Sequence, residues 1–336
     1  MKKILLVLIC TVFFAACSCA SPLEDAVERC RIETTGLLPD EPGGSVYSSK
    51  VLVQEMTLRF LQKDRERFDA LFRLLKKHFQ SRLMLLYKEL DFYLDPVACE
   101  NSVSTDIQAC QLLIEAAEEW NVREYSDWAQ KTAGRIRKFN VYREVLVDRA
   151  SWIERNSGIF NINEVSHVFS LASVEVRALQ MLQVRYPEWE AVAQRSLGIL
   201  LAGSAHFEMY SEYDIDRRRY KEKRAGAKEG LWIASNLIEG GLMPIQVLSW
   251  LKNKLAEDPR YFTHGESASF QSSALIVHIL RAAGEKELAD NLAEMIEKEF
   301  ATDSGLLCES GKKASLYDNL LWLSICAYGN IYKEEE

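Results

Sequence analysis

The sequence predicts an all-α fold built from helical hairpins. From Val46 onward, apolar residues recur at three- and four-residue spacing in segment after segment, and short breaks of Gly, Asn, Asp or Pro separate the segments. No segment shows a sustained alternation of β-branched residues, so we expect few or no strands. The expected helices span about 46–62, 64–79, 103–119, 122–139, 143–155, 164–184, 187–201, 217–238, 244–257, 267–283, 285–299 and 313–328.

These helices can be arranged in two ways. Antiparallel pairs can close into a ring, with one helix of each pair inside and the other outside. They can also stack into an open superhelix of the tetratricopeptide type. The spacing between pairs is irregular and no small-residue signature recurs every ~34 residues, which speaks against the superhelix. Periodicity by itself does not decide between the two.

The N-terminus has the pattern of a signal peptide over residues 1–16. Lys2 and Lys3 precede an apolar stretch from Ile4 to Phe14, which is shorter than the roughly 20 residues of a membrane-spanning helix. The sequence FAAC, ending at Cys17, resembles a lipobox. We therefore expect Cys17 to be lipidated and to anchor the exported protein to the bacterial cell envelope. An ordinary signal peptide cut near Cys17 is the alternative.

The segment that follows is expected to be a lipidated tether and loop, residues 17–45, because it is rich in Ser, Pro, Glu and Gly. Ordered structure should then begin near Val46. Residues 46–330 contain no further linker, so one domain with a single core is expected. The sequence leaves open which membrane carries the lipid and whether the domain forms oligomers.

Charge and cysteine content restrict the partners. The formal net charge of −8 becomes −10 without Lys2 and Lys3 (39 basic against 49 acidic residues), which argues against nucleic-acid binding. No CxxC pair or HExxH motif occurs, so no metal or other cofactor is assigned. Export permits disulfides among the six cysteines after Cys17, with connectivity open, but we interpret Cys110 and Cys326 as buried free thiols.

Four stretches, in order, resemble family 8 glycoside hydrolases. Residues 63–79, KDRERFDALFRLLKKHF, are similar to the family pattern ND(K/R)xxFDxLxxxxKKHF, and residues 104–108, STDIQ, are similar to ATDAD. Residues 213–217, YDIDR, lie where the family has YDxxR. The sequence LYDNLLWL at 316–323, with YGN at 328–330, resembles the closing YYDNSLxLLxLLxxSGN. The resemblance covers nearly the whole mature chain and implies an (α/α)6 toroid of six helical hairpins.

The family's proton donor is missing from its expected position. Inverting glycosidases use a protonated carboxyl group beside the leaving oxygen and a carboxylate that activates water. The donor is the glutamate of SEGxGYG in the family, and this motif aligns with SKVLVQE at 49–55. Lys50 occupies the glutamate's slot, so hydrolysis should be lost or reduced. A relocated acid, with Glu55 or Glu41 as candidates, would preserve it.

Other family positions supply the candidate base and substrate contacts. The resemblance implies that Asp214 is the base, with Arg217 as its partner, although an ordinary surface ion pair explains the same spacing. Asp106 keeps the first aspartate of the sugar-handling motif and Gln108 replaces the second. A favourable place in the first turn of a helix explains Asp106 equally well.

Aromatic and histidine side chains near the matched stretches are further candidates. Stacking on sugar rings is expected of the four tyrosines Tyr47, Tyr87, Tyr213 and Tyr317, with core packing as the alternative. We interpret His167 as a satisfied polar residue. The tryptophans interpreted as core residues are Trp120, Trp128, Trp189, Trp250 and Trp322.

Three functional hypotheses follow. The first is an envelope lipoprotein that binds a β-linked polysaccharide or oligosaccharide with little or no hydrolysis. The second is an active endo-acting inverting glycosidase, for β-1,4-glucan, xylan or chitosan, with a relocated acid. The third is a non-catalytic helical-repeat interaction lipoprotein, whose protein partners are unknown. An open superhelix would favour the third hypothesis.

Overall fold

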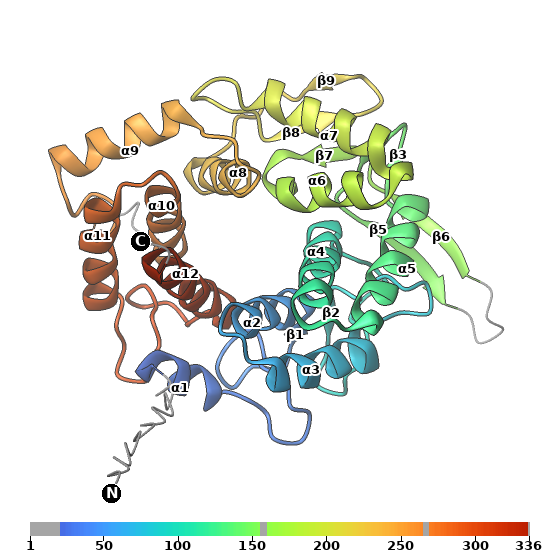
Figure 1. Cartoon of the computed structure of the whole chain (residues 1–336), viewed down its shortest axis with the longest axis horizontal. Helices are drawn as coiled ribbons and strands as arrows, with labels where there is room; N and C mark the ends of the chain where they lie inside the picture. Colours follow the sequence, from blue (N-terminus) through green and yellow to red (C-terminus); the bar gives the residue numbers. More distant parts are fainter. Residues whose placement is uncertain (1–20, 155–159, 265–268, 335–336) are drawn as a thin grey trace, which may run out of the picture.

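The computed structural model describes residues 21–154, 160–264 and 269–334. The segment expected to be a signal peptide, and Cys17, lie outside these ranges. Six helices surround the centre of the molecule, each contacting the next, and the last contacts the first (Figure 1). These inner helices are α2 (Ser49–Leu61), α4 (Val103–Trp120), α6 (Val176–Arg185), α8 (Ala227–Glu239), α10 (Phe270–Ala282) and α12 (Leu316–Glu334). The closed ring is the predicted (α/α)6 toroid and excludes the open superhelix.

The outer layer consists of the helices that return between the inner ones (Figure 1). They are α3 (Arg65–Leu74) with its π-helical continuation η1 (Leu75–Phe79), α5 (Arg123–Phe139), α7 (Glu190–Gly203) preceded by η3 (Pro187–Trp189), α9 (Ile245–Glu257) and α11 (Lys286–Glu299). The sixth outer position, against α12, is filled by α1 (Pro22–Glu28). The expectation that order begins near Val46 is therefore wrong, because α1 caps on Ser21 and packs against the last helix of the chain.

Short strands occupy the longer connections, which precede the inner helices. β1 (Tyr47–Ser48) pairs with β2 (Glu89–Leu90), β3 (Val141–Tyr142) with β4 (Val145–Leu146), and β5 (Ala150–Glu154) with β6 (Phe160–Val165). A three-stranded sheet has the order β7 (Val168–Ser170), β8 (Glu212–Asp214) and β9 (Arg219–Tyr220). All pairings are antiparallel. These strands bring elaborated loops to the N-terminal ends of the inner helices.

In three segments the expected helix is wrong for some or all of the residues, and the structure has strands there instead. Residues 143–154 contain β4 and β5, residues 164–175 contain the end of β6, β7 and the 3-10 turn η2 (Leu171–Ser173), and 217–226 contains β9. The turn between β3 and β4 places Arg143 and Glu144 at φ of 51° and 62°. Such hairpin turns are usually marked by Asn or Gly. Here neither residue is present, so the hairpin left no sequence signal.

The structure confirms that most of the tryptophans interpreted as core residues lie in the core. Trp128, Trp189 and Trp322 are buried, while Trp120 and Trp250 are partly buried and pack against the core. The cysteines in the described ranges, including Cys110 and Cys326, are free thiols. Within those ranges, no helix combines the length and apolarity needed to cross a bilayer.

Candidate functional site

The interior of the ring contains a cavity of about 310 Å³, here called the lumen cavity. Every inner helix, or the residue just before it, contributes to its wall. Its aromatic lining residues are Phe60, Trp232, Tyr317 and Tyr328. Its polar lining residues include Gln54, Gln108, Gln111, Glu115, Glu175, Arg177, Ser235, Asn236, Glu239, His278 and Ser324. The ring therefore encloses a site with both aromatic surfaces and carboxyl groups.

Helical spacing explains why these side chains face inward. Trp232, Asn236 and Glu239 recur at intervals of four and three residues along α8, so they share one face. Tyr317, Ser324 and Tyr328 form a corresponding stripe on α12. A stripe that faces solvent would be mostly polar, and a stripe packed in the core would be mostly apolar. The mixture of aromatic and polar residues distinguishes the lumen face.

Lys50 is the second residue of α2 and reaches two of the aromatic rings. Its Nζ lies 3.5 Å from the ring centre of Tyr317 and 5.6 Å from that of Trp232. Although the residue as a whole is exposed, protein surrounds its ammonium group, and this desolvation lowers the pKa of Lys50. The nearby Asp318 and Glu175 act in the opposite direction. Lys50 thus places a cation, held by ring faces and carboxyl groups, in the acid's slot.

Glu175 precedes α6 and lines the lumen cavity. Burial raises the pKa of this carboxyl group, the charge of Glu239 adds to the rise and Lys50 opposes it, so that the pKa lies at about 8. At neutral pH the protonated form of Glu175 therefore predominates. A carboxyl group that keeps its proton at pH 7 has the property a general acid needs.

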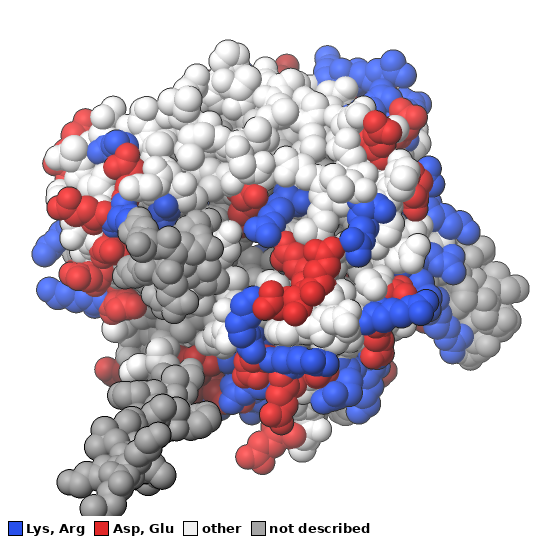
Figure 2. All heavy atoms as spheres, in the orientation of Figure 1, with Lys and Arg blue, Asp and Glu red and all other residues white. Residues whose placement is uncertain are grey.

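Two further acids in the cavity wall have basic neighbours. Glu239 Oε1 lies 3.4 Å from His278 Nε2. Glu115 Oε1 lies 2.8 Å from an Arg177 nitrogen. Figure 2 shows acidic side chains gathered beside basic ones near the middle of the visible face, over α4. The acids of the cavity wall therefore lie beside basic groups.

Asp318, the residue after Tyr317, is a second acid in this region that acts on Lys50. Burial raises its pKa, while Lys50 and Lys228 lower it. Its carboxylate also accepts a hydrogen bond from the amide of Gln271. Asp318 is thus an acidic neighbour of Lys50 whose carboxyl group is positioned by Gln271.

The structure does not bring the predicted base to this cavity. Asp214 ends β8, and its Oδ1 accepts a hydrogen bond from the backbone N–H of Arg217 at 2.9 Å. The Arg217 side chain is 69% exposed, and its Nε lies 3.8 Å from Asp214 Oδ2. Neither residue lines the lumen cavity. This arrangement is the turn and surface ion pair considered as the alternative.

Asp216, two residues on, forms a separate surface cluster. It accepts hydrogen bonds from Tyr142 Oη at 2.9 Å and lies 2.8 Å from His167 Nδ1. Arg143 contributes an ion pair at 3.2 Å. His167 is therefore a satisfied polar residue, as interpreted.

Asp106 is fully buried and does not line the cavity. One carboxylate oxygen accepts from the backbone N–H of Leu86 at 3.1 Å and the other from the Asn101 amide at 2.7 Å. Burial raises the pKa of Asp106 to about 7, and both hydrogen bonds oppose this. Gln108, two residues further on, faces the cavity instead. Asp106 thus fixes the chain before α4 rather than facing a ligand.

Of the four candidate tyrosines, one lines the lumen cavity and three lie elsewhere. Tyr317 lines the lumen cavity. Tyr47 is 1% exposed in the core, and Tyr87 is buried with its hydroxyl donating to Glu154 at 2.7 Å. Tyr213, on β8, packs edge to face against Tyr220 at 5.2 Å. Only Tyr317 of these four lies in the cavity wall.

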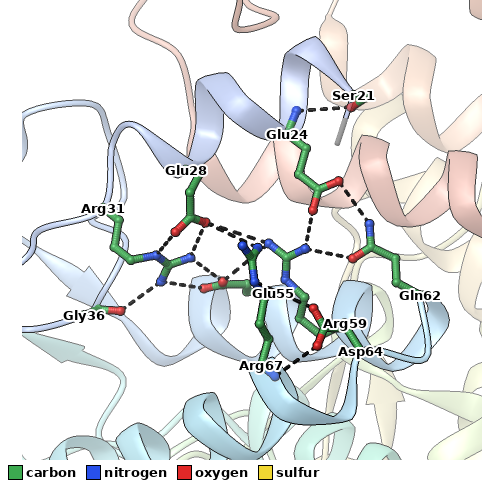
Figure 3. Close-up of polar contacts among 10 residues, drawn as sticks. All are labelled: Ser21, Glu24, Glu28, Arg31, Gly36, Glu55, Arg59, Gln62, Asp64 and Arg67. Carbon is green, nitrogen blue, oxygen red and sulfur yellow. Dashed lines mark hydrogen bonds and ion pairs between the residues drawn. The ribbon is translucent and has the colours of Figure 1, made fainter. Parts of the chain in front are cut away.

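The alternative acids Glu55 and Glu41 are committed elsewhere. Glu55 is buried on the side of α2 that faces α1, where Arg31 lies 2.5 Å and Arg59 4.0 Å from Oε1 (Figure 3). Glu41 forms an ion pair with Lys313 at 3.0 Å. The expectation that either could serve as the relocated acid is not supported by these positions, because neither lines the cavity.

Among the cavity residues that sequence reasoning missed are Glu175, Trp232, Glu239 and His278. A usable signal existed for two of them. Trp232 and Glu239 lie seven residues apart on a helix whose intervening residues are mostly buried. Glu175 fell inside a helix expected at 164–184, so its place before a helix start was not visible in the sequence.

Comparisons with solved structures place this fold among glycosidases. No protein-family model matches the sequence, and neither does any curated protein. An alpha-amylase from Clostridium perfringens matches with a TM-score of 0.79 at 17% identity, over 91% of this chain and 96% of that one. Endoglucanase Cel10, a family 8 glycosyl hydrolase from Klebsiella pneumoniae, matches with a TM-score of 0.63 at 13% identity, over 93% and 99%.

An endo-1,4-D-glucanase from Vibrio fischeri ES114 has a TM-score of 0.65 at 14% identity, over 92% of this chain and 94% of that one. At such identities the likeness establishes the fold and nothing finer. The domain is an all-α toroid of the kind found in family 8 glycoside hydrolases.

Proposed function

We propose that the chain is a bacterial cell-envelope lipoprotein whose toroid binds a β-linked polysaccharide or oligosaccharide, with family-type hydrolysis lost or reduced. The observation that carries this proposal is the position of Lys50. Its ammonium group lies over the ring of Tyr317, a residue of the lumen cavity wall, in the slot where the resemblance expects a proton donor. Loss of a general acid slows a glycosidase by about 10²- to 10⁴-fold.

The cavity wall supports glycan binding. Trp232 and Tyr317 have ring centres 6.5 Å apart, with their planes inclined by 38°. Flat apolar rings beside amide and carboxyl groups match the alternating faces and hydroxyls of a sugar. The names of two further structural neighbours, both endo-β-1,4-glucanases, favour a β-1,4-linked ligand.

The proposal is tested by binding and hydrolysis together. The mature chain is titrated calorimetrically with cellohexaose, xylohexaose and chitosan hexamer, and reducing-sugar release is measured on the matching polymers. We expect binding to at least one ligand, slow hydrolysis at most, and faster hydrolysis in Lys50→Glu. Lys252→Glu, on the outer helix α9, is the matched charge-reversal control.

Two outcomes contradict the proposal. Absence of binding to every β-linked ligand, or binding to amylose only, rules out the proposed ligand class. Rapid hydrolysis by the wild type that disappears in Asp214→Asn identifies an enzyme with the family's own base.

A further inference from the structure

Glu175 and Glu239 are held beside one another by a close approach of two inner helices. Val176, the first residue of α6, packs directly on Gly240 at the end of α8: a Cβ built on Gly240 would lie 2.2 Å from Val176 Cγ1. The Gln180 amide also donates to the carbonyl oxygen of Gly240 at 3.1 Å. The residues immediately before this contact are Glu175 and Glu239, and both line the lumen cavity.

A second tie fixes the same junction one turn earlier. The Asn236 amide donates to the carbonyl oxygen of Ala172 at 3.2 Å, which holds the turn before α6 against α8. The carboxyl groups therefore project from a rigid junction and not from a mobile loop. Rigid placement is what acid–base chemistry requires of its groups.

The two carboxyl groups have different surroundings. Glu175 is partly buried in the cavity wall and its pKa is raised, whereas the Glu239 side chain is 41% exposed beside His278. Two neighbouring carboxyl groups whose environments differ in this way can divide the roles of acid and base. His278 Nε2, buried and without a hydrogen-bond partner, lies 3.4 Å from Glu239 and can orient that carboxylate.

We propose that Glu175 and Glu239 form a hydrolytic acid–base pair inside the lumen cavity, displaced from the family's acid slot, and that this pair acts on the ends of short oligosaccharides. The inference rests on the proposed glycan binding. The cavity volume of about 310 Å³ is at the lower end of the range for ligand sites, so it suits a chain end and not a polymer passing through.

The reaction balances without a cofactor. Glu175 donates its proton to the glycosidic oxygen as the bond from that oxygen to the anomeric carbon breaks. A water oxygen forms the new bond to the anomeric carbon, and Glu239 accepts the proton that the water loses. Exchange with solvent returns a proton to Glu175 and removes one from Glu239. His278 acts through Glu239 and is a positioning residue.

The experiment compares two substrates that differ in their need for a proton donor. Cellotetraose has a poor leaving group, and 2,4-dinitrophenyl β-cellobioside has one that departs without protonation. We expect Glu175→Gln to lose about 10²-fold or more on cellotetraose and less than about tenfold on the dinitrophenyl glycoside. Glu239→Gln should lose activity on both. The wild-type rate on cellotetraose should fall as pH rises through about 8, because Glu175 then loses its proton.

Glu118→Gln is the matched control, because Glu118 pairs with Arg185 outside the cavity and should behave as the wild type. Thermal unfolding and calorimetric binding establish that each variant is folded and binds. Binding without any hydrolysis overturns this inference and leaves the proposed function standing. Equal losses on both substrates in Glu175→Gln overturn its role as proton donor. Failure to bind any glycan overturns the proposed function itself.

Discussion

Lys50 stands where the family resemblance expects a glutamate, and a glutamate with a raised pKa lies elsewhere in the cavity wall, at Glu175. The slot near the start of α2, where the family resemblance expects a protonated glutamate, holds a cation over Tyr317. The protonated glutamate instead precedes α6, where burial supplies the raised pKa. Burial disfavours the charged form of any side chain, so the same low-polarity interior lowers the pKa of Lys50 and raises that of Glu175.

Asp106 and Glu175 show that a raised pKa does not by itself identify a functional acid. Asp106 is fully buried and Glu175 partly buried, and desolvation is the main cause that raises their pKa values, to about 7 and about 8. Both oxygens of Asp106 are used by Leu86 and Asn101. Glu175 borders empty space. Access to a cavity, and not titration, separates the two roles.

At the residue scale we predict that Trp232→Ala weakens glycan binding about tenfold or more. Removal of the ring eliminates one wall of the aromatic surface, and aromatic contacts of this kind contribute about 0.5–1.5 kcal/mol beyond the area they bury. Isothermal titration with the best β-linked hexamer measures the change. Tyr93→Ala, which removes a ring that is 81% exposed and outside the cavity, should bind normally. Equal affinity in Trp232→Ala would place the glycan elsewhere.

Among the elements, α1 is joined to the ring by a network of ion pairs. We call this network, formed by Glu24, Glu28, Arg31, Glu55 and Arg59, the clasp. Helix α1 packs on α12, and its Glu24 and Glu28 face Arg59 and Arg31 in a network that also includes Glu55 of α2 (Figure 3). Arg59 is 3% and Glu55 2% exposed, so these charges are removed from water. Buried ion pairs are strongly destabilising when one partner is removed.

We therefore predict that Glu55→Gln lowers the free energy of unfolding by about 3–5 kcal/mol, because two arginines lose a shared buried carboxylate. Chemical denaturation measures the difference. The control is Glu257→Gln, which removes an exposed partner of Lys254 and should change stability by less than about 1 kcal/mol. A similar small change in Glu55→Gln would show that solvent reaches the clasp.

The clasp should also weaken in acid. The hydrogen bond from Arg31 holds the pKa of Glu28 below its ordinary value of 4.5, although burial opposes this. A carboxyl group with a lowered folded-state pKa contributes stability above its unfolded pKa and loses it as pH falls through the folded one. The contribution of Glu28 should thus be complete above about pH 5 and disappear at lower pH. Glu28→Gln should flatten that part of the stability profile.

At the scale of the whole molecule, the ring is closed by segments from opposite ends of the chain. Helix α12 contacts α2, and across this seam the Gln54 amide donates to Ser324 Oγ at 2.9 Å in a buried position. Helix α1 covers the outer side of α12. The beginning and end of the domain therefore stabilise one another.

We predict that Cys17→Ser abolishes lipid incorporation and membrane association. The cysteine sulfur is the attachment point expected of a lipobox, and two or more acyl chains are required for stable anchoring. Metabolic labelling with an alkyne fatty acid, followed by membrane fractionation, measures both effects. Cys30→Ser, in the folded domain, is the control and should keep both. Labelling that persists in Cys17→Ser would contradict the proposed anchor.

Much of the fold could be predicted because long amphipathic helices record their own periodicity. The segments at 103–119, 122–139, 244–257 and 285–299 match α4, α5, α9 and α11 within one or two residues. The hairpins at 141–170 escaped prediction because their pairing depends on contacts between separate segments, and the turn at Arg143 and Glu144 lacks the usual residues.

The site was less predictable because its residues come from different hairpins. Lys50 and Tyr317, predicted separately from the resemblance, do meet, since α2 and α12 adjoin at the seam. Asp214 does not join them, although its motif matches well. Glu175 and Glu239 are 64 positions apart, and the packing of α6 against α8, with Val176 on Gly240, makes them neighbours.

The sequence by itself determined the helical class, the likeness to family 8 toroids, and the presence of a lysine in the acid's slot. These follow from local periodicity and from residue identity at matched positions. The tertiary structure decided the closure of the ring, the structural role of Asp106, and the meeting of Glu175 with Glu239 around one cavity. Burial and proximity across long sequence separations exist only after the hairpins pack, and they set both the pKa values and the composition of the site.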